Sequence, residues 1–315
     1  MIDVLRARRR IADYVRRTPL MHSAWLSDLS HARVSLKPES LQVSNSFKSR
    51  GAFNAVIARL ERPEGPPSQL VTASAGNHGR ALAAAARTFG LPLIVFTPAD
   101  APQTKLAAIR RDGADLRAIG RDYDDAERIA KAYATDTGAE FISPYNDADV
   151  IDGAATVALE MFEDDPAIET LVVPIGGGGL ISGVATVAKA INPRCEVIGV
   201  ELDVANAFQQ SVRAGKLVEI EAGASLADGL GGNPDPETIT FAIIQQLVDR
   251  IVTVSEADLA NAIVGLVDAE HLIAEGAGAA ATAALVGRRI DVRDRRVAVV
   301  VSGGNIDRAR LRSLL

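Results

Sequence analysis

Short apolar runs alternate with longer alanine-rich stretches along most of this chain, and this alternation constrains the fold more than any other feature. The short runs are rich in β-branched residues and span 70–72, 93–96, 171–174, 197–200 and 297–301. The alanine-rich stretches have the length of helices and span 80–89, 104–112, 123–137, 153–163, 181–190 and 256–269. Strands that are apolar throughout and alternate with helices indicate parallel sheets covered on both faces. The sequence therefore predicts an α/β fold.

Charge and cysteine content exclude several classes of protein. The net charge of -6 gives no basic field that would attract nucleic acid. No apolar run reaches the about 20 residues of a membrane span, and the first residues lack the apolar core of a signal peptide. The single cysteine, Cys195, excludes an internal disulfide and is expected to be a structural thiol. We therefore expect a cytoplasmic protein without a nucleic-acid or membrane partner.

The segment around Lys48 is the first with possible chemistry. Ser44, Asn45 and Ser46 precede an apolar-periodic run, which is an N-cap signature and predicts Lys48 in the first turn of a helix. The positive end of a helix lowers the pKa of a lysine, and a lysine with a lowered pKa suits Schiff-base chemistry. Taken alone, this segment is also compatible with a surface lysine.

A second segment, residues 72–79, follows a predicted strand and precedes a predicted helix. Backbone amides at a helix N-terminus bind anions, and Ser74, Asn77 and His78 add polar side chains. This loop could hold a substrate carboxylate or could be a simple turn with a capping serine.

Four consecutive glycines, Gly176, Gly177, Gly178 and Gly179, join a strand to a helix. Such a run is entropically unfavourable unless several backbone amides must converge on a phosphate. The spacing matches neither the dinucleotide fingerprint nor the NTPase P-loop, which leaves a single phosphate monoester. After the last strand, Ser302 stands where parallel sheets place their ligands, so it could face a cofactor or belong to a plain turn.

In this order, these motifs resemble the fold-type II pyridoxal-phosphate (PLP) enzymes, and most closely the serine/threonine dehydratase and serine racemase group. The resemblance extends over nearly the whole chain, from Arg17 to Asp307, and includes features of the dehydratases assigned to hydroxyectoine breakdown. It implies two α/β domains like those of the tryptophan synthase β subunit, with PLP in the cleft between them. Structure-breaking residues at 62–68 and near 143–145 suggest where the chain passes from one domain to the other. We expect residues 1–68 and 146–315 to form a large PLP-binding domain and 69–145 a small mobile domain.

The resemblance also implies roles for individual residues. Lys48 would carry PLP as a Schiff base and act as the base on Cα, Phe47 would lie against the pyridine ring, and Asn77 would bond the phenolic oxygen. The four glycines would cradle the phosphate, and Ser302 would face the pyridine nitrogen. The substrate carboxylate would be held by the loop residues Ser74, Gly76, Asn77 and His78.

Two further expectations come from the same resemblance. Some relatives bind Mg²⁺ or another divalent cation, and its ligands here would be Glu201 and the Ala205 carbonyl. Ala207 occupies the position of a third ligand that is a carboxylate in relatives, and hard cations need several oxygen ligands. The family typically forms homodimers.

The resulting hypothesis is a PLP-dependent dehydratase, or ammonia-lyase, that removes water from a threonine- or serine-like β-hydroxy amino acid and releases a 2-oxo acid and ammonia. The substrate could instead be 3-hydroxyaspartate or an amino acid derived from hydroxyectoine. A serine racemase, a PLP synthase that performs β-replacement and a non-catalytic phosphate-binding protein remain alternatives. Ala75 stands where serine racemase carries a serine, so efficient racemisation is not expected.

Overall fold

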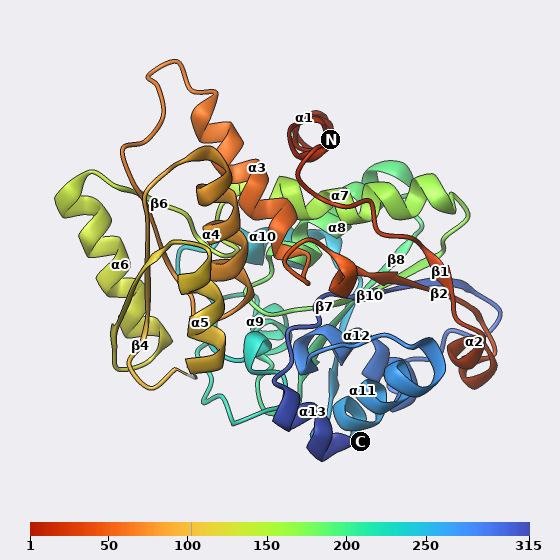
Figure 1. The fold of residues 1–315 in the computed structure, drawn as a ribbon. Coiled ribbons are helices and arrows are strands. Elements are labelled where there is room, and N and C mark those ends of the chain that lie inside the picture. The colour runs from red at the N-terminus through yellow and green to blue at the C-terminus, as the bar shows by residue number, and fades with distance from the viewer. Residues whose placement is uncertain (102) are drawn as a thin grey trace.

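The computed structural model describes residues 1–101 and 103–315 and contains two separate β-sheets (Figure 1). The larger sheet has six strands in the order β1-β2-β10-β7-β8-β9, and the smaller has four in the order β5-β4-β3-β6. All neighbouring strands are parallel except β1 and β2, which form an antiparallel edge. The predicted α/β fold is confirmed, with this one short antiparallel strand as a departure.

The large sheet draws its strands from both ends of the chain. They are β1 (Met21–His22), β2 (Arg33–Pro38), β7 (Thr170–Pro174), β8 (Glu196–Leu202), β9 (Arg250–Val254) and β10 (Arg296–Val301). The elements connected to it are α1 (Ile2–Ile11), α2 (Ala24–Ser30), η1 (Glu39–Leu41), α3 (Lys48–Leu60), α7 (Ala148–Asp164), α8 (Gly179–Ile191), α9 (Ala207–Ala214), η2 (Asp228–Leu230), α10 (Thr240–Leu247), α11 (Glu256–Glu270), α12 (Gly276–Val286) and α13 (Arg308–Leu314). Within residues 1–101 and 103–315, no helix is long and apolar enough to cross a membrane.

Alternating side chains of the central strands explain why helices cover both faces of the large sheet. In β10, Val297, Val299 and Val301 join the apolar cluster that contains α11 and α12. The intervening Ala298 and Val300 join the cluster that contains α7 and α8. Figure 1 shows these two helix pairs on opposite sides of the strands. A strand with two apolar faces has no solvent side, which is why its sequence is apolar throughout.

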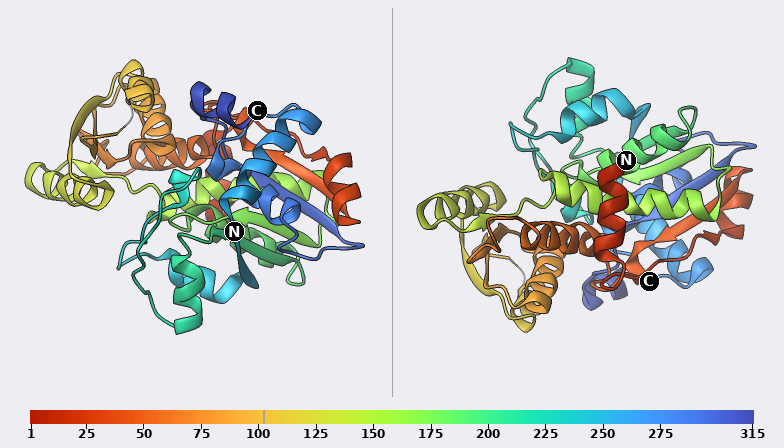
Figure 2. Two further views of the ribbon diagram at one scale, coloured as in Figure 1. Left: turned by 90° about the horizontal axis from the view of Figure 1, so that it is seen from below. Right: turned by 90° about the horizontal axis from the view of Figure 1, so that it is seen from above.

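The small sheet is formed by one continuous part of the chain. Its strands are β3 (Leu70–Ala73), β4 (Leu93–Pro98), β5 (Asp115–Gly120) and β6 (Glu140–Phe141), and its helices are α4 (Asn77–Phe89), α5 (Gln103–Arg111) and α6 (Tyr123–Thr137). Leu70 and Val95 pack in the cluster with α3 and α4, whereas Val71 and Phe96 pack in the cluster with α6. Figure 2 shows this part as a lobe set beside the rest of the molecule.

The start of α3 differs from the sequence prediction in one respect. Lys48 is the first residue of the helix, so it does lie in the first turn, but the N-cap is Phe47 and no side chain caps the helix. The predicted capping by Ser44, Asn45 and Ser46 is wrong. Ser44 Oγ instead pairs with Ser49 Oγ at 2.6 Å, and the backbone of Asn45 is left-handed, with φ of 58°.

A buried ionic cluster holds the first turn of α3 in place. The Arg50 side chain is fully buried and donates to both carboxylate oxygens of Glu39 and of Glu160 at 2.7–2.8 Å. Thr156 Oγ1 and the Arg16 carbonyl accept further bonds from the same guanidinium. Lys37 Nζ donates to Glu160 at 2.6 Å, so two carboxylates face two cations. Burial alone would raise the pKa of Glu39, but the nearby Arg50 charge and its hydrogen bonds lower it below its usual value.

We predict that Arg50→Met will destabilise the protein by about 3–5 kcal/mol, because two carboxylates would remain buried with too little compensating charge. The change in the urea denaturation midpoint measures this effect. Arg293→Gln removes an exposed ion pair with Asp291 and serves as the control, with no measurable change expected. Equal stability of the two variants would contradict the central position of this cluster.

Candidate active site

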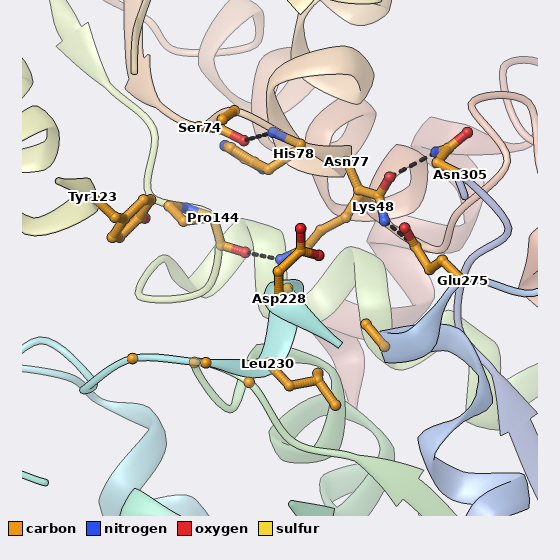
Figure 3. Close-up of a pocket in the computed structure, with 18 of the residues that line it drawn as sticks. Lys48, Ser74, Asn77, His78, Tyr123, Pro144, Asp228, Leu230, Glu275 and Asn305 are labelled. Carbon is orange, nitrogen blue, oxygen red and sulfur yellow. Dashed lines mark hydrogen bonds between the residues drawn. The ribbon is translucent and has the colours of Figure 1, made fainter. Parts of the chain in front are cut away.

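A cavity of about 810 Å³ lies between the two sheets and is lined by loops at the carboxyl ends of β3, β4, β7 and β10 (Figure 3). This is the edge at which parallel sheets place ligands. Every residue predicted from the motifs to bind a cofactor or substrate lines it: Phe47, Lys48, Ser74, Gly76, Asn77, His78, Gly176, Gly177, Gly178, Gly179 and Ser302. The fold thus brings together motifs that are far apart in sequence.

The amine of Lys48 is the central group of the cavity (Figure 3). Its Nζ donates to the Pro144 carbonyl at 2.6 Å and lies 5.0 Å from the centroid of the Phe47 ring. Burial lowers the pKa of Lys48 to about 8. The helix N-terminus was expected to lower the pKa of Lys48, whereas burial is the cause in the structure. The unprotonated, nucleophilic form of the amine is therefore far more populated near neutral pH than in an ordinary lysine.

The loop from Ser74 to His78 presents hydrogen-bond donors at the start of α4. Ser74 Oγ accepts the backbone N–H groups of Gly76 and Gly79, at 3.2 and 3.0 Å. Both lone pairs of this oxygen are thereby used, which leaves its proton available for an anionic ligand. Asn77 and His78 are the first two residues of α4, where backbone N–H groups have no acceptor within the helix. The loop can bind a carboxylate through these amides and the Ser74 hydroxyl.

His78 contributes less than the sequence suggested. Its ring is buried, and burial together with the Lys48 charge lowers its pKa to about 3, so the imidazole is neutral. Nε2 lies 3.3 Å from the Ile142 carbonyl, which fixes the proton on Nε2 and leaves Nδ1 as an acceptor. Nδ1 has no partner within the part of the chain that the structure describes. Its backbone N–H, rather than its ring, is therefore the group that can meet a carboxylate.

Asn77 belongs to a polar network on the side of Lys48 that faces away from Pro144 (Figure 3). Its Nδ2 donates to Glu275, and its Oδ1 accepts from Asn305 Nδ2 at 2.6 Å. Asn305 in turn donates to the Ser44 carbonyl at 2.9 Å. The network fixes which way the Asn77 amide faces, so its second Nδ2 proton remains available to a ligand.

The glycine run packs tightly against an aromatic side chain. A Cβ on Gly177 would lie 2.2 Å from the Tyr145 ring, and one on Gly179 would lie 3.0 Å from Tyr145 Cα. Gly178 has φ of 86°, a left-handed conformation that favours glycine. Gly179 begins α8 and lines the cavity, and the N–H groups at the start of a helix have no acceptor within it. The loop can therefore keep this conformation, in which its amides could bind a phosphate, only with glycine at these positions.

Ser302 directly follows the last residue of β10 and lines the cavity. Its side chain is 5% exposed, and its Oγ lies 3.3 Å from the Ala277 carbonyl, to which it donates. A neutral hydroxyl is thus the group that this part of the cavity offers to a ligand.

The residues predicted to bind a divalent cation do not line the cavity and do not fit a cation. The Glu201 oxygens accept the N–H groups of Phe208 and Gln209 at 2.9 and 2.7 Å. The Ala205 carbonyl accepts from Leu202, and Ala207 has no donor atom in its side chain. Burial raises the pKa of Glu201 to about 7, against those two bonds. In the described ranges, no group of three or more His, Cys, Asp or Glu side chains could hold a metal.

The sequence analysis missed three groups that shape this site. Glu275 bonds Asn77, Asn305 orients it, and Tyr145 covers the glycine run. Glu275 and Asn305 lie within the stretch that resembles the family, from Arg17 to Asp307, so that resemblance was the signal for them. Tyr145 carried none, because its contact with the glycines depends on the path of the chain between the two sheets.

These residues fit pyridoxal phosphate. The coenzyme needs an amine that is unprotonated often enough to react, a cradle for one phosphate and groups for its ring substituents. Lys48 has a lowered pKa, the glycine run is free of side chains, and Asn77 and Ser302 offer polar groups from two other directions.

Comparisons with known proteins agree with this geometry. Residues 11–303 match the family model described as pyridoxal-phosphate dependent enzyme. An L-threonine ammonia-lyase from Thermotoga maritima is 40% identical over 97% of this chain and 75% of its own length. An L-threo-3-hydroxyaspartate ammonia-lyase from Saccharomyces cerevisiae is 36% identical over 99% of this chain and 95% of its own length. The structure of maize serine racemase superposes with a TM-score of 0.91 at 32% identity, covering 99% of this chain and 97% of that one.

We predict that Gly177→Ala will weaken binding of pyridoxal phosphate about tenfold, because the added Cβ must displace the Tyr145 ring that supports the loop. Titration followed by absorbance measures the affinity. Gly231→Ala is a matched control on the cavity wall, where the nearest atom to a new Cβ is the Asp228 carbonyl oxygen at 3.7 Å. Unchanged affinity in Gly177→Ala would argue against the glycine run as the phosphate site.

Proposed function

The chain belongs to the family of pyridoxal-phosphate dependent enzymes, and from this we propose that it is a dehydratase that eliminates water from a β-hydroxy amino acid and yields a 2-oxo acid and ammonia. The observation that carries the proposal is the Lys48 amine, which has a lowered pKa and shares one cavity with two separate loops at helix N-termini, each suited to an anion. One anion site suits the coenzyme phosphate and the other suits an amino acid carboxylate. Relatives that are 34–40% identical to this chain include a threonine dehydratase and ammonia-lyases, which supports this reaction class.

Coenzyme attachment and the proton on Cα are assigned to Lys48. When bound, pyridoxal phosphate withdraws electrons from the Cα of an attached amino acid and so makes its proton acidic. Lys48 Nζ is the attachment point, and once released it is the base nearest the cavity centre. Its lowered pKa lets it accept this proton and give it up again near neutral pH. Phe47 provides a flat apolar surface beside that amine.

The remaining residues are assigned to orientation. Asn77, with its amide fixed by Glu275 and Asn305, is placed to bond the coenzyme hydroxyl. The α4 loop holds the substrate carboxylate through the Ser74 hydroxyl and the amides of Asn77 and His78, while the Gly76 N–H positions the Ser74 oxygen. The glycine run holds the phosphate. These contacts would fix Cα–H near Lys48, which is the positioning that elimination requires.

Ser302 favours elimination over reactions that need a long-lived carbanion. A hydroxyl cannot keep a ring nitrogen protonated as a carboxylate would, so electron withdrawal from Cα is weaker. Weak withdrawal is sufficient when a β-substituent departs as the Cα–H bond breaks. The side chain at this position therefore agrees with a β-hydroxy substrate.

We also propose that residues 69–145 move as a small domain relative to 1–68 and 146–315, because each part has its own sheet. A cytoplasmic location agrees with the buried free thiol of Cys195. A homodimer agrees with the exposed apolar side chains of Leu41, Val43 and Ile273, and sedimentation equilibrium would test it.

We do not extend the proposal to a divalent cation, since Glu201 and Ala205 already bond backbone amides.

We predict that the purified protein, supplied with pyridoxal phosphate, will show an absorption band near ~410 nm and that Lys48→Ala will lack it. The same variant should lose ammonia and oxo-acid release from serine or threonine by about 10⁴-fold or more, since it lacks both attachment point and base. Far-ultraviolet circular dichroism controls for folding. A colourless wild-type protein in the presence of the coenzyme would falsify the proposal.

We predict little racemisation by the wild-type enzyme and a gain in Ala75→Ser. Racemisation needs a proton donor on each face of Cα; Lys48 serves one face, and Ala75, in the cavity wall, offers none on the other. Chiral chromatography of serine recovered after incubation with L-serine measures D-serine directly. Efficient D-serine formation by the wild-type enzyme would contradict the assignment of Ala75.

A further inference from the structure

Arg80 is a cation of the cavity wall that the proposed reaction leaves without a role. It lies on α4, lines the cavity and is partly buried. Among residues 1–101 and 106–315, no side chain or backbone group forms a hydrogen bond or ion pair with its guanidinium. Desolvation lowers the pKa of Arg80 and repulsion from Arg111 adds to this, against the attraction of Glu275 and Asp112. Partial burial removes water from the guanidinium, and this desolvation is unfavourable when no hydrogen-bond acceptor replaces the water. Such a site is stabilised by an anionic ligand.

Three of the acidic side chains that line the cavity interact with residues other than Arg80. Glu275 accepts from Asn77, and Asp307 accepts the N–H groups of Ala309 and Arg310 at the start of α13. Asp228 also has an interaction partner. Burial raises the pKa of Asp124, as do its neighbours Asp122 and Glu219.

The position of Arg80 relative to the anion loop indicates what it binds. Arg80 follows Asn77 by three residues on α4, so the two share a helix face and are separated by about 4.5 Å along the axis. Asn77 points into the cavity (Figure 3), so Arg80 leaves the helix on the cavity side. In a four-carbon amino diacid, the two carboxylates are separated by two carbon atoms, a spacing comparable with one helical turn. A carboxylate next to the one held by the loop therefore falls within reach of a long, planar guanidinium.

We propose that Arg80 binds a second carboxylate, and that the preferred substrate is a β-hydroxy amino acid with an acidic side chain, such as 3-hydroxyaspartate. This inference rests on the proposed dehydration and adds its substrate class. Arg80 is then a specificity-determining residue, and threonine and serine are substrates that leave it unpaired. An unpaired cation in the complex disfavours them relative to the diacid.

The test compares the holoenzyme with Arg80→Gln and Arg80→Lys on three substrates: L-threo-3-hydroxyaspartate, L-threonine and L-serine. We expect the wild-type enzyme to have its highest kcat/KM on the diacid. Arg80→Gln should lower that value about 10- to 100-fold, mainly through KM, because a charge-assisted bond to the substrate is lost. Its values for threonine and serine should change by no more than about twofold, and Arg80→Lys should retain part of the diacid activity.

Arg308→Gln is the matched control, since Arg308 also lines the cavity but is exposed at the start of α13. Its ratio of diacid to threonine kcat/KM should equal that of the wild-type enzyme. Binding of L-aspartate and L-alanine, which have no hydroxyl to lose, gives a second readout through the coenzyme absorption band. Arg80→Gln should weaken aspartate binding and leave alanine binding unchanged.

Each other outcome contradicts either the role of Arg80 or the dehydratase proposal. Equal losses on all three substrates would show that Arg80 binds the common carboxylate, and an unchanged diacid rate in Arg80→Gln would show that it binds neither; both overturn the inference. Wild-type preference for threonine or serine overturns it too, while the dehydratase proposal stands. If none of the three substrates releases an oxo acid although the coenzyme band is present, the dehydratase proposal itself fails.

Discussion

The contact between Arg50 and two buried carboxylates is the constraint on which the rest of the site depends. It joins the first turn of α3 to Glu39 after β2 and to Glu160 on α7. Lys48 is two residues before Arg50, so its amine is placed by an interaction that it does not make itself. Because every partner is buried, the first turn cannot shift without exposing or unpairing a charge.

Two cations two residues apart are treated in opposite ways by the fold. Arg50 has carboxylates on both sides, which raise its pKa despite burial. Lys48 has a carbonyl oxygen as its hydrogen-bond acceptor, and burial lowers its pKa to about 8. The first arrangement keeps a permanent charge for structure, and the second gives an amine that changes charge near neutral pH. The difference lies in the partners supplied by neighbouring elements rather than in the helix that both residues share.

The sequence predicted those parts of the molecule that follow from local patterns. Strands such as β10 were found because both of their faces are apolar, whereas β9, mostly only partly buried, gives a weaker pattern. The motif residues were correctly gathered into one cavity, because loops at the carboxyl ends of parallel strands meet there. The cap of α3 was predicted wrongly, since Ser44 bonds Ser49 in place of a free amide. The bond between Asn77 and Glu275 spans 198 residues, a separation that no local pattern reveals.

The two loops proposed to bind anions follow strands of different sheets. The glycine run and the start of α8 follow β7 of the large sheet, whereas the α4 loop follows β3 of the small sheet. In the proposed function, one loop would hold the coenzyme phosphate and the other the substrate carboxylate, with the Lys48 amine between them. Both contacts would then form together only when the two sheets stand at the right separation. Substrate recognition and the placement of Cα–H beside Lys48 would depend on the same relation between the sheets, and a side chain of α4 such as Arg80 would influence both.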